Sequence, residues 1–502
     1  MDIAPHFDAF ARRYSAGEPQ VVSTRLVADL ETPVSAFLKL ADAQDNTFLF
    51  ESVEGGARIG RYSFIAMQPD IIWRCQRQEA EINRQARYDA EAFEPLTGHP
   101  LDTLRALQAE SRIELPSGTP PMASSLIGYM GYDSIRLIEN IPDDNPDVLG
   151  IPDAYFMRPT ITAVFDRLED CITMFTPVFP RDGLTAEAAW ELARERLANT
   201  VRDFERSLPH RRERVEASAR LHEPQSNMSH ESFKAMVERA KNYIYAGDIF
   251  QVVPSQRFAV PFQLPPFSLY RALRRLNPSP FLFFGQFADF AIAGSSPEIL
   301  VRLRDGNVTV RPLAGTRKRG ATPEEDKALA EDLLSDPKEL AEHLMLLDLG
   351  RNDVGRVAKI GTVHVTEQMA IEHYSHVMHI TSNVVGELDP SHDAMDALMA
   401  GFPTGTVSGA PKIRAMEIID ELEPERRGLY AGAVGYLGAN GDMDTCIALR
   451  TAIVKDGKMY VQAGGGVVAD SDPDAEYQES CNKARALIRA AEEAMRFAAG
   501  GR

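Results

Sequence analysis

Four glutamates stand in two pairs, each just inside a segment whose pattern predicts a helix. The pairs are Glu339 with Glu342 and Glu476 with Glu479. Each pair follows an Asp-Pro step, Asp336-Pro337 or Asp472-Pro473, which is typical of a helix start because Asp caps free N–H groups and Pro suits the first turn. A spacing of three residues puts each pair on one helical face. Two such faces could share a cation.

Two alternatives remain open for these acids. Carboxylates in a first turn also complement the helix dipole, so either pair alone could be a solvated helix start. Two pairs that faced one another would repel unless a cation lay between them. Carboxylates with retained water suit Mg²⁺. A shared Mg²⁺ site is therefore the alternative with a chemical consequence.

Three glycines precede the second acidic helix directly. A predicted strand ends at Gly464, Gly465 and Gly466, and Lys483 lies on the same helical face as Glu479. Glycines let backbone N–H groups approach a carboxylate with no Cβ in the way. The combination predicts a site for a carboxylate-bearing ligand beside a hard cation.

Other polar segments have less specific patterns. The Gly/Thr/Ser loop from Pro403 to Lys412 lacks the spacing of a phosphate loop, so it either binds an anion or simply starts a helix. His376 and His379 would lie on opposite faces of a strand, which makes them poor co-ligands. The Ser-Pro-Glu turn that ends at Glu298 reads by itself as a solvated acid.

Composition narrows the function class. The 502 residues carry a net charge of −19, which disfavours binding to nucleic acid or anionic membranes. The cysteines are scattered without a C-x-x-C pair, which favours a reducing compartment over a zinc cluster or disulfides; they are Cys75, Cys171, Cys446 and Cys481. We see neither a secretory signal nor an apolar run of about 18 residues, and expect a cytoplasmic protein.

The chain divides at a charged, Pro-containing stretch. Residues 1–206 show several strands with occasional helices, which indicates an α+β lobe and not a regular βαβ repeat. Residues 207–228 are poor in apolar side chains and predict a linker. Residues 229–502 hold the polar motifs described above.

From Ser232 to Ala490 the chain resembles the chorismate-utilising enzymes almost continuously. The motifs are Ile249 to Arg257, Ser296-Pro297-Glu298, Pro312 to Thr316, Glu342-His343 with Asp348 to Asp353, Pro403 to Lys412, Arg427 to Tyr430, Leu449-Arg450 and Ala463 to Lys483. The first half resembles the N-terminal lobe of the anthranilate synthase large subunits through Glu51 to Gly55 and Gly60 to Phe64. The resemblance implies a large two-lobed α/β sandwich with antiparallel sheets in the core and helices outside.

The resemblance also implies a reaction and its residues. Chorismate would accept ammonia beside its carboxyl-bearing ring carbon, lose its ring hydroxyl and release pyruvate, giving anthranilate. Glu298 matches the general acid of the family, and His379 and Thr406 match positions associated with ring chemistry and pyruvate loss. Glu342 and Glu479 match ligands of Mg²⁺. Glu339 and Glu476 would bind the same ion directly or through water. The substrate contacts would be Gly315, Thr316, Tyr430, Arg450, Gly464, Gly465, Gly466 and Lys483.

Two positions discriminate within the family. Isochorismate and salicylate synthases carry a Lys base for water at the position of Gln251, and Gln cannot serve as that base. Aminodeoxychorismate synthase carries a nucleophilic Lys at the position of Ala314. Both residues of this chain favour ammonia as the nucleophile and anthranilate as the product.

Partners and regulation follow from the same resemblance. None of the four cysteines lies in a glycine-flanked elbow with a glutaminase pattern, so a separate glutamine amidotransferase subunit is expected, in a heterotetramer of two large and two small subunits. Tryptophan would inhibit at residues that match the family's inhibitor site: Glu51, Ser52, Pro280, Phe281, Leu282, Val434, Tyr436 and Cys446. Phe281 lacks the hydroxyl of the commoner Tyr.

Three alternatives stay open. The enzyme could stop at 2-amino-2-deoxyisochorismate and keep the pyruvyl group. The chain could be a catalytically silent tryptophan-binding subunit, although the full set of acids argues against this. Without the resemblance, a Mg²⁺-dependent hydrolase of a phosphorylated substrate would also fit.

Overall fold

The computed structural model describes the chain except residues 43, 53–59, 209–220, 375–376 and 500–502. Most of the predicted linker, the Val53-Glu54-Gly55 part of one motif and His376 therefore lie outside the described residues. The end of the predicted linker, Gln225–Ser226, is a short strand, β9, which pairs with the second-half strand β11 (Ser255–Pro261).

Strands dominate the first half. Its helices are α1 (Phe7–Ser15), α2 (Pro33–Leu40), α3 (Pro100–Glu110) and α4 (Ala186–Phe204), with 3₁₀ turns at Pro121–Ala123 and Tyr132–Leu137. Its strands are β1 (Gln20–Val27), β2 (Thr47–Glu51), β3 (Tyr62–Gln76), β4 (Glu79–Asn83), β5 (Phe93–Leu96), β6 (Ser125–Met130), β7 (Ala154–Asp166) and β8 (Cys171–Val178).

The second half adds most of the helices around further strands. The helices are α5 (His230–Ala246), α6 (Pro266–Leu276), α7 (Pro323–Ser335), α8 (Pro337–Gly355), α9 (Ala394–Gly401), α10 (Lys412–Leu422) and α11 (Pro473–Ala498), with a 3₁₀ turn at Gly405–Val407. The strands besides β9 and β11 are β10 (Gln251–Val252), β12 (Phe281–Gln286), β13 (Phe290–Ser296), β14 (Ile299–Arg304), β15 (Asn307–Val310), β16 (Leu313–Lys318), β17 (His364–His373), β18 (Val377–Glu387), β19 (Gly409–Ala410), β20 (Ala433–Gly438), β21 (Met443–Ile447), β22 (Thr451–Lys455) and β23 (Lys458–Gly464).

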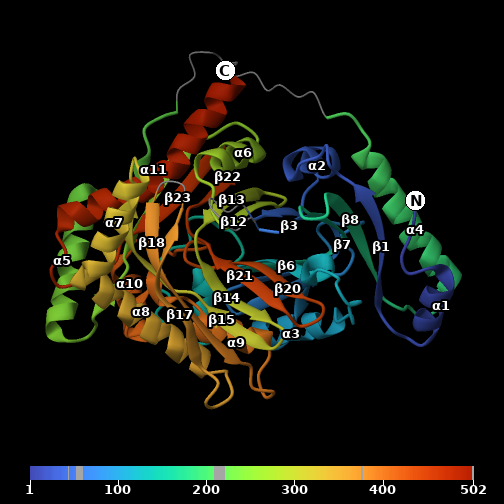
Figure 1. Ribbon diagram of the computed structural model, residues 1–502, viewed down its shortest axis with the longest axis horizontal. Helices are drawn as coiled ribbons and strands as arrows, with labels where there is room; N and C mark the ends of the chain where they lie inside the picture. Colours follow the sequence, from blue (N-terminus) through green and yellow to red (C-terminus); the bar gives the residue numbers. More distant parts are fainter. Residues whose placement is uncertain (43, 53–59, 209–220, 375–376, 500–502) are drawn as a thin grey trace.

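Strands of the two halves form one hydrogen-bonded sheet. From β11 the antiparallel pairings run through β23, β22, β13 and β12, cross to the first half at β2, and continue through β3, β7 and β6. They return to the second half at β20 and continue through β21, β14 and β15 to β18. First-half strands therefore join two groups of second-half strands (Figure 1).

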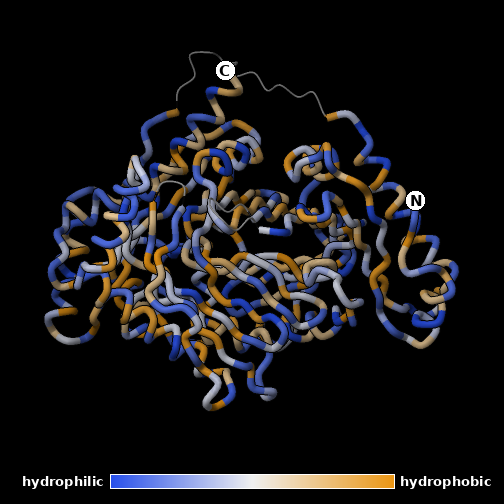
Figure 2. Tube along the Cα trace, viewed as in Figure 1, coloured by the Kyte–Doolittle hydropathy of each residue, from blue (hydrophilic) through white to orange (hydrophobic). Residues whose placement is uncertain are grey.

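Alternating side chains divide the core into layers. In β12, Phe283 packs in a central cluster made of strand and loop residues, whereas Leu282 and Phe284 pack in an outer cluster with helices α1, α2, α4, α6 and α11. A second outer cluster joins the β6–β20–β21–β14 group to α3, α5, α8, α9 and α10. The order is helices, sheet, sheet, helices, which confirms the predicted sandwich, and apolar stretches of the trace run through its interior (Figure 2).

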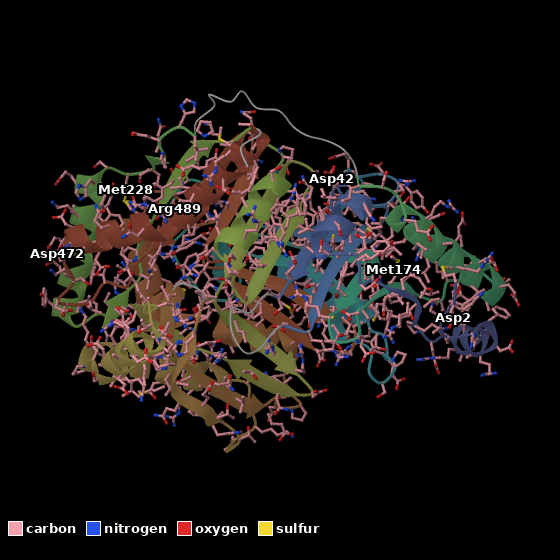
Figure 3. The ribbon with its side chains drawn as sticks, turned by 45° about the horizontal axis from the view of Figure 1, so that its top comes forward. Asp2, Asp42, Met174, Met228, Asp472 and Arg489 are labelled. Carbon is pink, nitrogen blue, oxygen red and sulfur yellow. The ribbon has the colours of Figure 1, made fainter. Side chains whose placement is uncertain are left out.

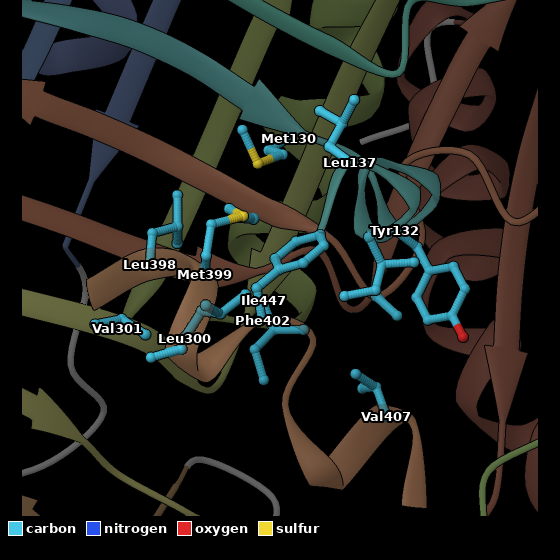
Figure 4. Packing of buried hydrophobic residues seen from close by; sticks show 14 of the residues in the cluster. Met130, Tyr132, Leu137, Leu300, Val301, Leu398, Met399, Phe402, Val407 and Ile447 are labelled. Carbon is cyan, nitrogen blue, oxygen red and sulfur yellow. The ribbon is translucent and has the colours of Figure 1, made fainter. Parts of the chain in front are cut away.

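The second outer cluster holds the Pro403–Val407 segment in place. Phe402 and Val407 are buried beside Tyr132, Leu398 and Ile447 (Figure 4). Thr406, between buried neighbours, is thereby fixed against the end of β13. Within the described residues, no helix is both long and apolar enough to span a bilayer.

Candidate active site

Both acidic helices begin where the Asp-Pro steps predict. Asp336 accepts from the N–H groups of Lys338 and Glu339, and Asp472 accepts from the N–H of Ala475. The caps set the first turns of α8 and α11, and so fix where the glutamate pairs project. The local prediction of these two helix starts is confirmed.

The glycine turn at the end of β23 lies between the two acid pairs. A Cβ on Gly465 would lie 2.9 Å from Glu476 Oε2 and 3.5 Å from Glu479 Oε1. A Cβ on Gly466 would lie 2.4 Å from Gln251 Nε2 and 3.7 Å from Glu342 Oε1. The fourth acid is close to another predicted contact, because a Cβ on Gly315 would lie 3.1 Å from Glu339 Oε2. Any side chain at these glycines would fill the space that the carboxylates face.

The negative charges of neighbouring glutamates raise the pKa values of Glu342 and Glu476. Burial raises the pKa of Glu342, and the nearby charges of Glu339 and Glu479 raise it further. Burial also raises the pKa of Glu476, and Glu479 adds to the effect. Lys483 opposes both shifts; its Nζ lies 2.8 Å from Glu479 Oε1 and donates to Gly464 O at 2.9 Å. Lys338 also lowers the pKa of Glu476, and Arg317 pairs with Glu339 at 3.1 Å, so the four carboxylates share their space with several cationic side chains.

The carboxylate and amide oxygen atoms around the glycines are ligand types that bind a divalent cation. Glu476 Oε2 and Gln251 Oε1 are buried without a hydrogen-bond partner, so two acceptors remain unused beside the glycines. Gln251 Nε2 donates to Glu342 Oε1 at 3.0 Å, and Arg317 Nη1 donates to Glu339 Oε1 at 3.1 Å. Among the described residues, no three His, Cys, Asp or Glu side chains are gathered closely enough to hold a metal ion. Carboxylate oxygens are the ligand type that Mg²⁺ prefers, so the residues fit this ion by chemistry and not by a preformed cluster.

Glu298 is buried, contrary to its reading as a solvated turn. It follows β13, and 4% of its surface is exposed. Burial raises its pKa to about 8, although hydrogen bonds to the Thr406 side chain and the Leu313 backbone act in the opposite direction. Near neutral pH the carboxyl is therefore protonated. A cavity of about 30 Å³, room for one water, adjoins both Glu298 and Thr406.

His379 offers one free ring nitrogen. Its Nδ1 lies 2.9 Å from the Gly315 carbonyl oxygen and 3.1 Å from Thr316 Oγ1. Because a carbonyl only accepts, Nδ1 carries the proton, and Nε2, which is buried without a partner, is an acceptor. Burial lowers the pKa of His379 to about 4, so the ring is neutral near pH 7.

Arg450 has a guanidinium without an anionic partner. No hydrogen bond or ion pair joins it to any other residue that the structure describes. Burial lowers its pKa, while the Tyr374 hydroxyl acts in the opposite direction. Its backbone has φ +47°, an uncommon conformation for a side chain other than Gly or Asn. An unpaired, half-buried guanidinium in a strained turn suits a bidentate grip on a ligand carboxylate.

The remaining predicted contacts join the same group. Tyr430 is buried and hydrogen-bonded to the backbone of Gly464, and burial raises its pKa to about 12. The charges of Arg450 and Lys483 both act on His379. The structure therefore brings together the residues predicted for catalysis, substrate and metal, which are Gln251, Glu298, Gly315, Thr316, Glu339, Glu342, His379, Thr406, Tyr430, Arg450, Gly464, Gly465, Gly466, Glu476, Glu479 and Lys483.

The residues predicted for tryptophan lie on both faces of one sheet. Val434, Tyr436 and Cys446 are buried in the central cluster, and Phe281 packs against it. Leu282 belongs to the outer cluster, and its strand partner Glu51 points the same way. Ser52 follows Glu51 and approaches Gly60, and Pro280 precedes β12.

The Glu51 carboxylate is already engaged. Its Oε1 accepts from Tyr270 Oη at 2.6 Å and from Arg274 Nε at 2.9 Å, and its Oε2 accepts from Arg274 Nη2 at 2.8 Å. Arg274 lies on α6, so this bond ties the first half to the second. In the structure Glu51 thus has a clear interlobe role.

The sequence analysis assigned no role to two groups that the structure places at the site, Tyr374 and Arg427. Tyr374 packs its ring edge-on against His379 at 5.3 Å, and its hydroxyl donates to Pro297 O at 3.4 Å. Arg427 is buried, donates to Val253 O and Val407 O, and pairs with Glu423. It thus holds the segments that carry Gln251 and Thr406. Only the position of Arg427 in a family motif could have pointed to it.

The comparisons with known proteins agree on one family. The chorismate binding enzyme model matches residues 68–489. Anthranilate synthase component 1 of Cereibacter sphaeroides is 63% identical over 492 residues, 98% of this chain and 98% of that protein. Anthranilate synthase component I from Streptococcus pneumoniae superposes with a TM-score of 0.76 at 39% identity, covering 92% of this chain and 99% of that one. The menaquinone-specific isochorismate synthase of Escherichia coli shares the fold, with a TM-score of 0.70 at 20% identity over 97% and 98% of the two chains.

Proposed function

Because this chain belongs to the chorismate binding enzymes, as a lyase of the anthranilate synthase large-subunit type in tryptophan biosynthesis, we propose that it converts chorismate and ammonia to anthranilate, pyruvate and water, with Mg²⁺. The observation that carries the proposal is the buried, protonated Glu298 beside an unpaired Arg450 and a cluster of four glutamates. An acid, a carboxylate grip and a cation site are what this reaction needs.

The first half of the reaction is an addition with loss of water. Arg450 and the N–H groups near Gly464 hold the carboxylates of chorismate. The nitrogen of ammonia bonds to the ring carbon beside the carboxyl-bearing carbon, and the ring hydroxyl leaves as water with the proton of Glu298. Gln251 has no basic group, and ammonia needs none, because its lone pair is already nucleophilic.

The second half restores aromaticity. A ring proton leaves, the bond between the ring carbon and the enolpyruvyl oxygen breaks, and the released enolpyruvate takes up a proton at its CH₂ carbon to become pyruvate. His379 Nε2 is a neutral acceptor suited to that proton, and Thr406 holds the Glu298 carboxyl in place. Glu342 and Glu479 would hold Mg²⁺, with Glu339 and Glu476 direct or through water. When bound, the ion polarises the ring carboxylate and stabilises charge as the double bonds shift.

One assay tests the reaction. Chorismate, ammonium and Mg²⁺ should give anthranilate fluorescence and an equal amount of pyruvate. Accumulation of aminodeoxyisochorismate without pyruvate would point to the enzyme that stops early, and no loss of chorismate would point to a silent subunit. Glu479→Gln should abolish the Mg²⁺-dependent turnover, and near-normal turnover in that variant would remove the metal assignment.

A separate glutamine amidotransferase subunit is the proposed ammonia source. Burial raises the pKa of the Cys75 thiol to about 12 and also raises that of Cys446, so neither is a reactive thiolate. The isolated chain should use ammonium and not glutamine. We propose assembly as two large with two small subunits in the cytoplasm, which light scattering on the purified complex would check.

Feedback inhibition by tryptophan is the proposed regulation. The apolar wall formed by Phe281, Val434, Tyr436 and Cys446 supports an indole-binding surface. Titration of activity with tryptophan tests it, and flat activity at saturating tryptophan would remove the claim. Phe281→Tyr restores the commoner hydroxyl and should change the inhibition constant while leaving uninhibited turnover unchanged.

A further inference from the structure

The side chain of Tyr374 lies between the proposed proton acceptor and the segment that carries the proposed proton donor. Its ring packs against the His379 imidazole with 5.3 Å between the ring centres and 72° between the ring planes, an edge-to-face arrangement. Its hydroxyl donates to the carbonyl oxygen of Pro297, the residue before Glu298, at 3.4 Å. Only 8% of the residue is exposed. One buried side chain therefore contacts both His379 and the backbone next to Glu298.

The ring of Tyr374 makes the stronger of these two contacts. A distance of 3.4 Å is long for a hydrogen bond from a hydroxyl to an oxygen, which is usually about 2.5–3.0 Å. Tyr129, another buried tyrosine, donates to the carbonyl oxygen of Pro152 at 2.7 Å, which is a bond of ordinary length. We therefore look to the aromatic ring of Tyr374 for its role, and not to its hydroxyl.

The His379 ring needs a packing contact to hold its orientation. The terminal torsion of a histidine side chain has a broad, roughly twofold energy profile, so the torsion alone does not fix the ring. The bonds from Nδ1 to Gly315 O, at 2.9 Å, and to Thr316 Oγ1, at 3.1 Å, anchor one edge. Nε2 on the opposite edge is buried without a partner. The edge-to-face contact with Tyr374 restricts the rotation that these bonds leave open.

The backbone of Tyr374 is itself held from two sides. Tyr374 directly follows β17, and its N–H donates to Val377 O at 2.8 Å, at the start of β18. Its carbonyl oxygen accepts from Arg319 Nη1 at 2.6 Å. Arg319 in turn pairs with Asp326 on α7 at 2.8 Å. These bonds fix the position from which the Tyr374 ring reaches His379.

We propose that Tyr374 is a positioning residue whose ring keeps His379 Nδ1 on the Gly315 carbonyl and His379 Nε2 free for the substrate. Arg319 supports it by holding the Tyr374 backbone. The inference rests on the proposed function, in which His379 takes the ring proton in the second half of the reaction. Loss of the ring should therefore slow aromatisation more than the addition of ammonia, and aminodeoxyisochorismate should be released.

Three variants and one control separate the ring from the hydroxyl and from the fold. Tyr374→Leu removes the ring, Tyr374→Phe removes only the hydroxyl, and Arg319→Met withdraws the bond to the Tyr374 carbonyl without opening the core. Tyr14→Leu is the matched control, because Tyr14 is a tyrosine of similar burial, 7% exposed. It lies on α1, beside Asp2 and at the opposite side of the molecule from Asp472, the cap of α11 (Figures 1 and 3).

Two measurements report on the position of the imidazole and on its consequence. The nitrogen chemical shifts of histidine-labelled protein give the tautomer of His379, whose signal is identified by its loss in His379→Gln. Assays with chorismate, ammonium and Mg²⁺ give the ratio of aminodeoxyisochorismate to anthranilate. Thermal unfolding by circular dichroism shows which variants are folded.

The expected result depends on the ring. Tyr374→Leu should show a mixture of His379 tautomers, and its ratio of aminodeoxyisochorismate to anthranilate should rise about 10- to 100-fold, the typical effect of a small misplacement of a reacting group. Arg319→Met should shift both quantities in the same direction by a smaller factor. Tyr374→Phe should retain the Nδ1–H tautomer and the wild-type product ratio, and Tyr14→Leu should change neither.

Three outcomes would contradict the positioning role. They are a wild-type tautomer and product ratio in folded Tyr374→Leu, an equal change in Tyr374→Phe, and an equal change in Tyr14→Leu. If Tyr374→Leu does not fold, an unchanged tautomer and product ratio in Arg319→Met would overturn the proposal. A wild-type chain that makes no anthranilate would instead overturn the proposed function, since the tautomer of His379 still reports on its contact with Tyr374.

Discussion

At the scale of single residues, burial decides the chemistry. Glu298 and Glu479 are both glutamates near the same ligand space. Glu298 is enclosed and keeps its proton to about pH 8, whereas Glu479 is half exposed beside Lys483. The roles proposed for them, proton donor for Glu298 and cation ligand for Glu479, need these opposite environments.

Replacing Glu298 by Gln should remove the proposed general acid, because an amide cannot supply the proton, while the side chain keeps its size and shape. We expect kcat to fall by about 10²- to 10⁴-fold, the typical contribution of a positioned acid, with chorismate affinity changed little. Rapid-mixing assays and equilibrium binding measure the two quantities. A variant that retained more than a tenth of wild-type kcat would assign the proton to another group.

The pH profile should show the same carboxyl. In the proposed mechanism protonated Glu298 is the active form. Because its pKa is about 8, turnover at a fixed concentration of free ammonia should fall about tenfold per pH unit above that value. His379, with a pKa of about 4, stays neutral across this range and adds no further change to the pH–rate profile. Thr406→Val removes a hydrogen bond that favours the ionised carboxyl, so the fall in turnover should move to higher pH. A flat profile to pH 10 would contradict the assignment.

At the scale of elements, the turn after β23 separates two helix starts. α11 presents Glu476 and Glu479 to it and α8 presents Glu342, and the glycines leave the intervening space open. Its geometry therefore affects the acid cluster directly.

Gly466→Ala should damage the site through one methyl group. The new Cβ would lie 2.4 Å from Gln251 Nε2, so the Gln251–Glu342 bond must shift. We expect kcat/KM to fall at least about tenfold and stability to fall by about 1–3 kcal/mol. Gly355→Ala, at the end of α8 with nothing within 4 Å of the new Cβ, is the control and should leave turnover unchanged. Equal activity of the two variants would mean that the turn can adapt.

At the scale of the whole molecule, the two halves share their core. The first half supplies β2, β3, β7 and β6, which join two groups of second-half strands in one sheet, and the central cluster draws on both halves. The Glu51–Arg274 pair adds a buried charge contact across the same boundary. The predicted boundary near residues 207–228 thus divides the chain but leaves one continuous sheet.

Residues 229–502 alone should therefore fail to fold. Without the first half, β12 loses β2 and β20 loses β6, which leaves open edges and an exposed apolar layer. We expect no cooperative thermal transition by circular dichroism, and recovery of one when residues 1–206 are co-expressed. A sharp transition for residues 229–502 alone would show that the second half is an independent domain.

The sequence alone determined the features that depend on near neighbours. The Asp-Pro caps, the glutamate pairs at spacing three and the motifs of the family were readable because each involves residues within a turn or two of one another. Only the tertiary structure decided the contacts between distant segments. Gln251 and Glu342 are 91 positions apart, Glu51 and Arg274 are 223 apart, and burial of Glu298 depends on segments around it that no local pattern identifies. A carboxyl group has the same formula in a solvated turn and in a closed core; its pKa, and with it its role, is set by what the fold packs around it.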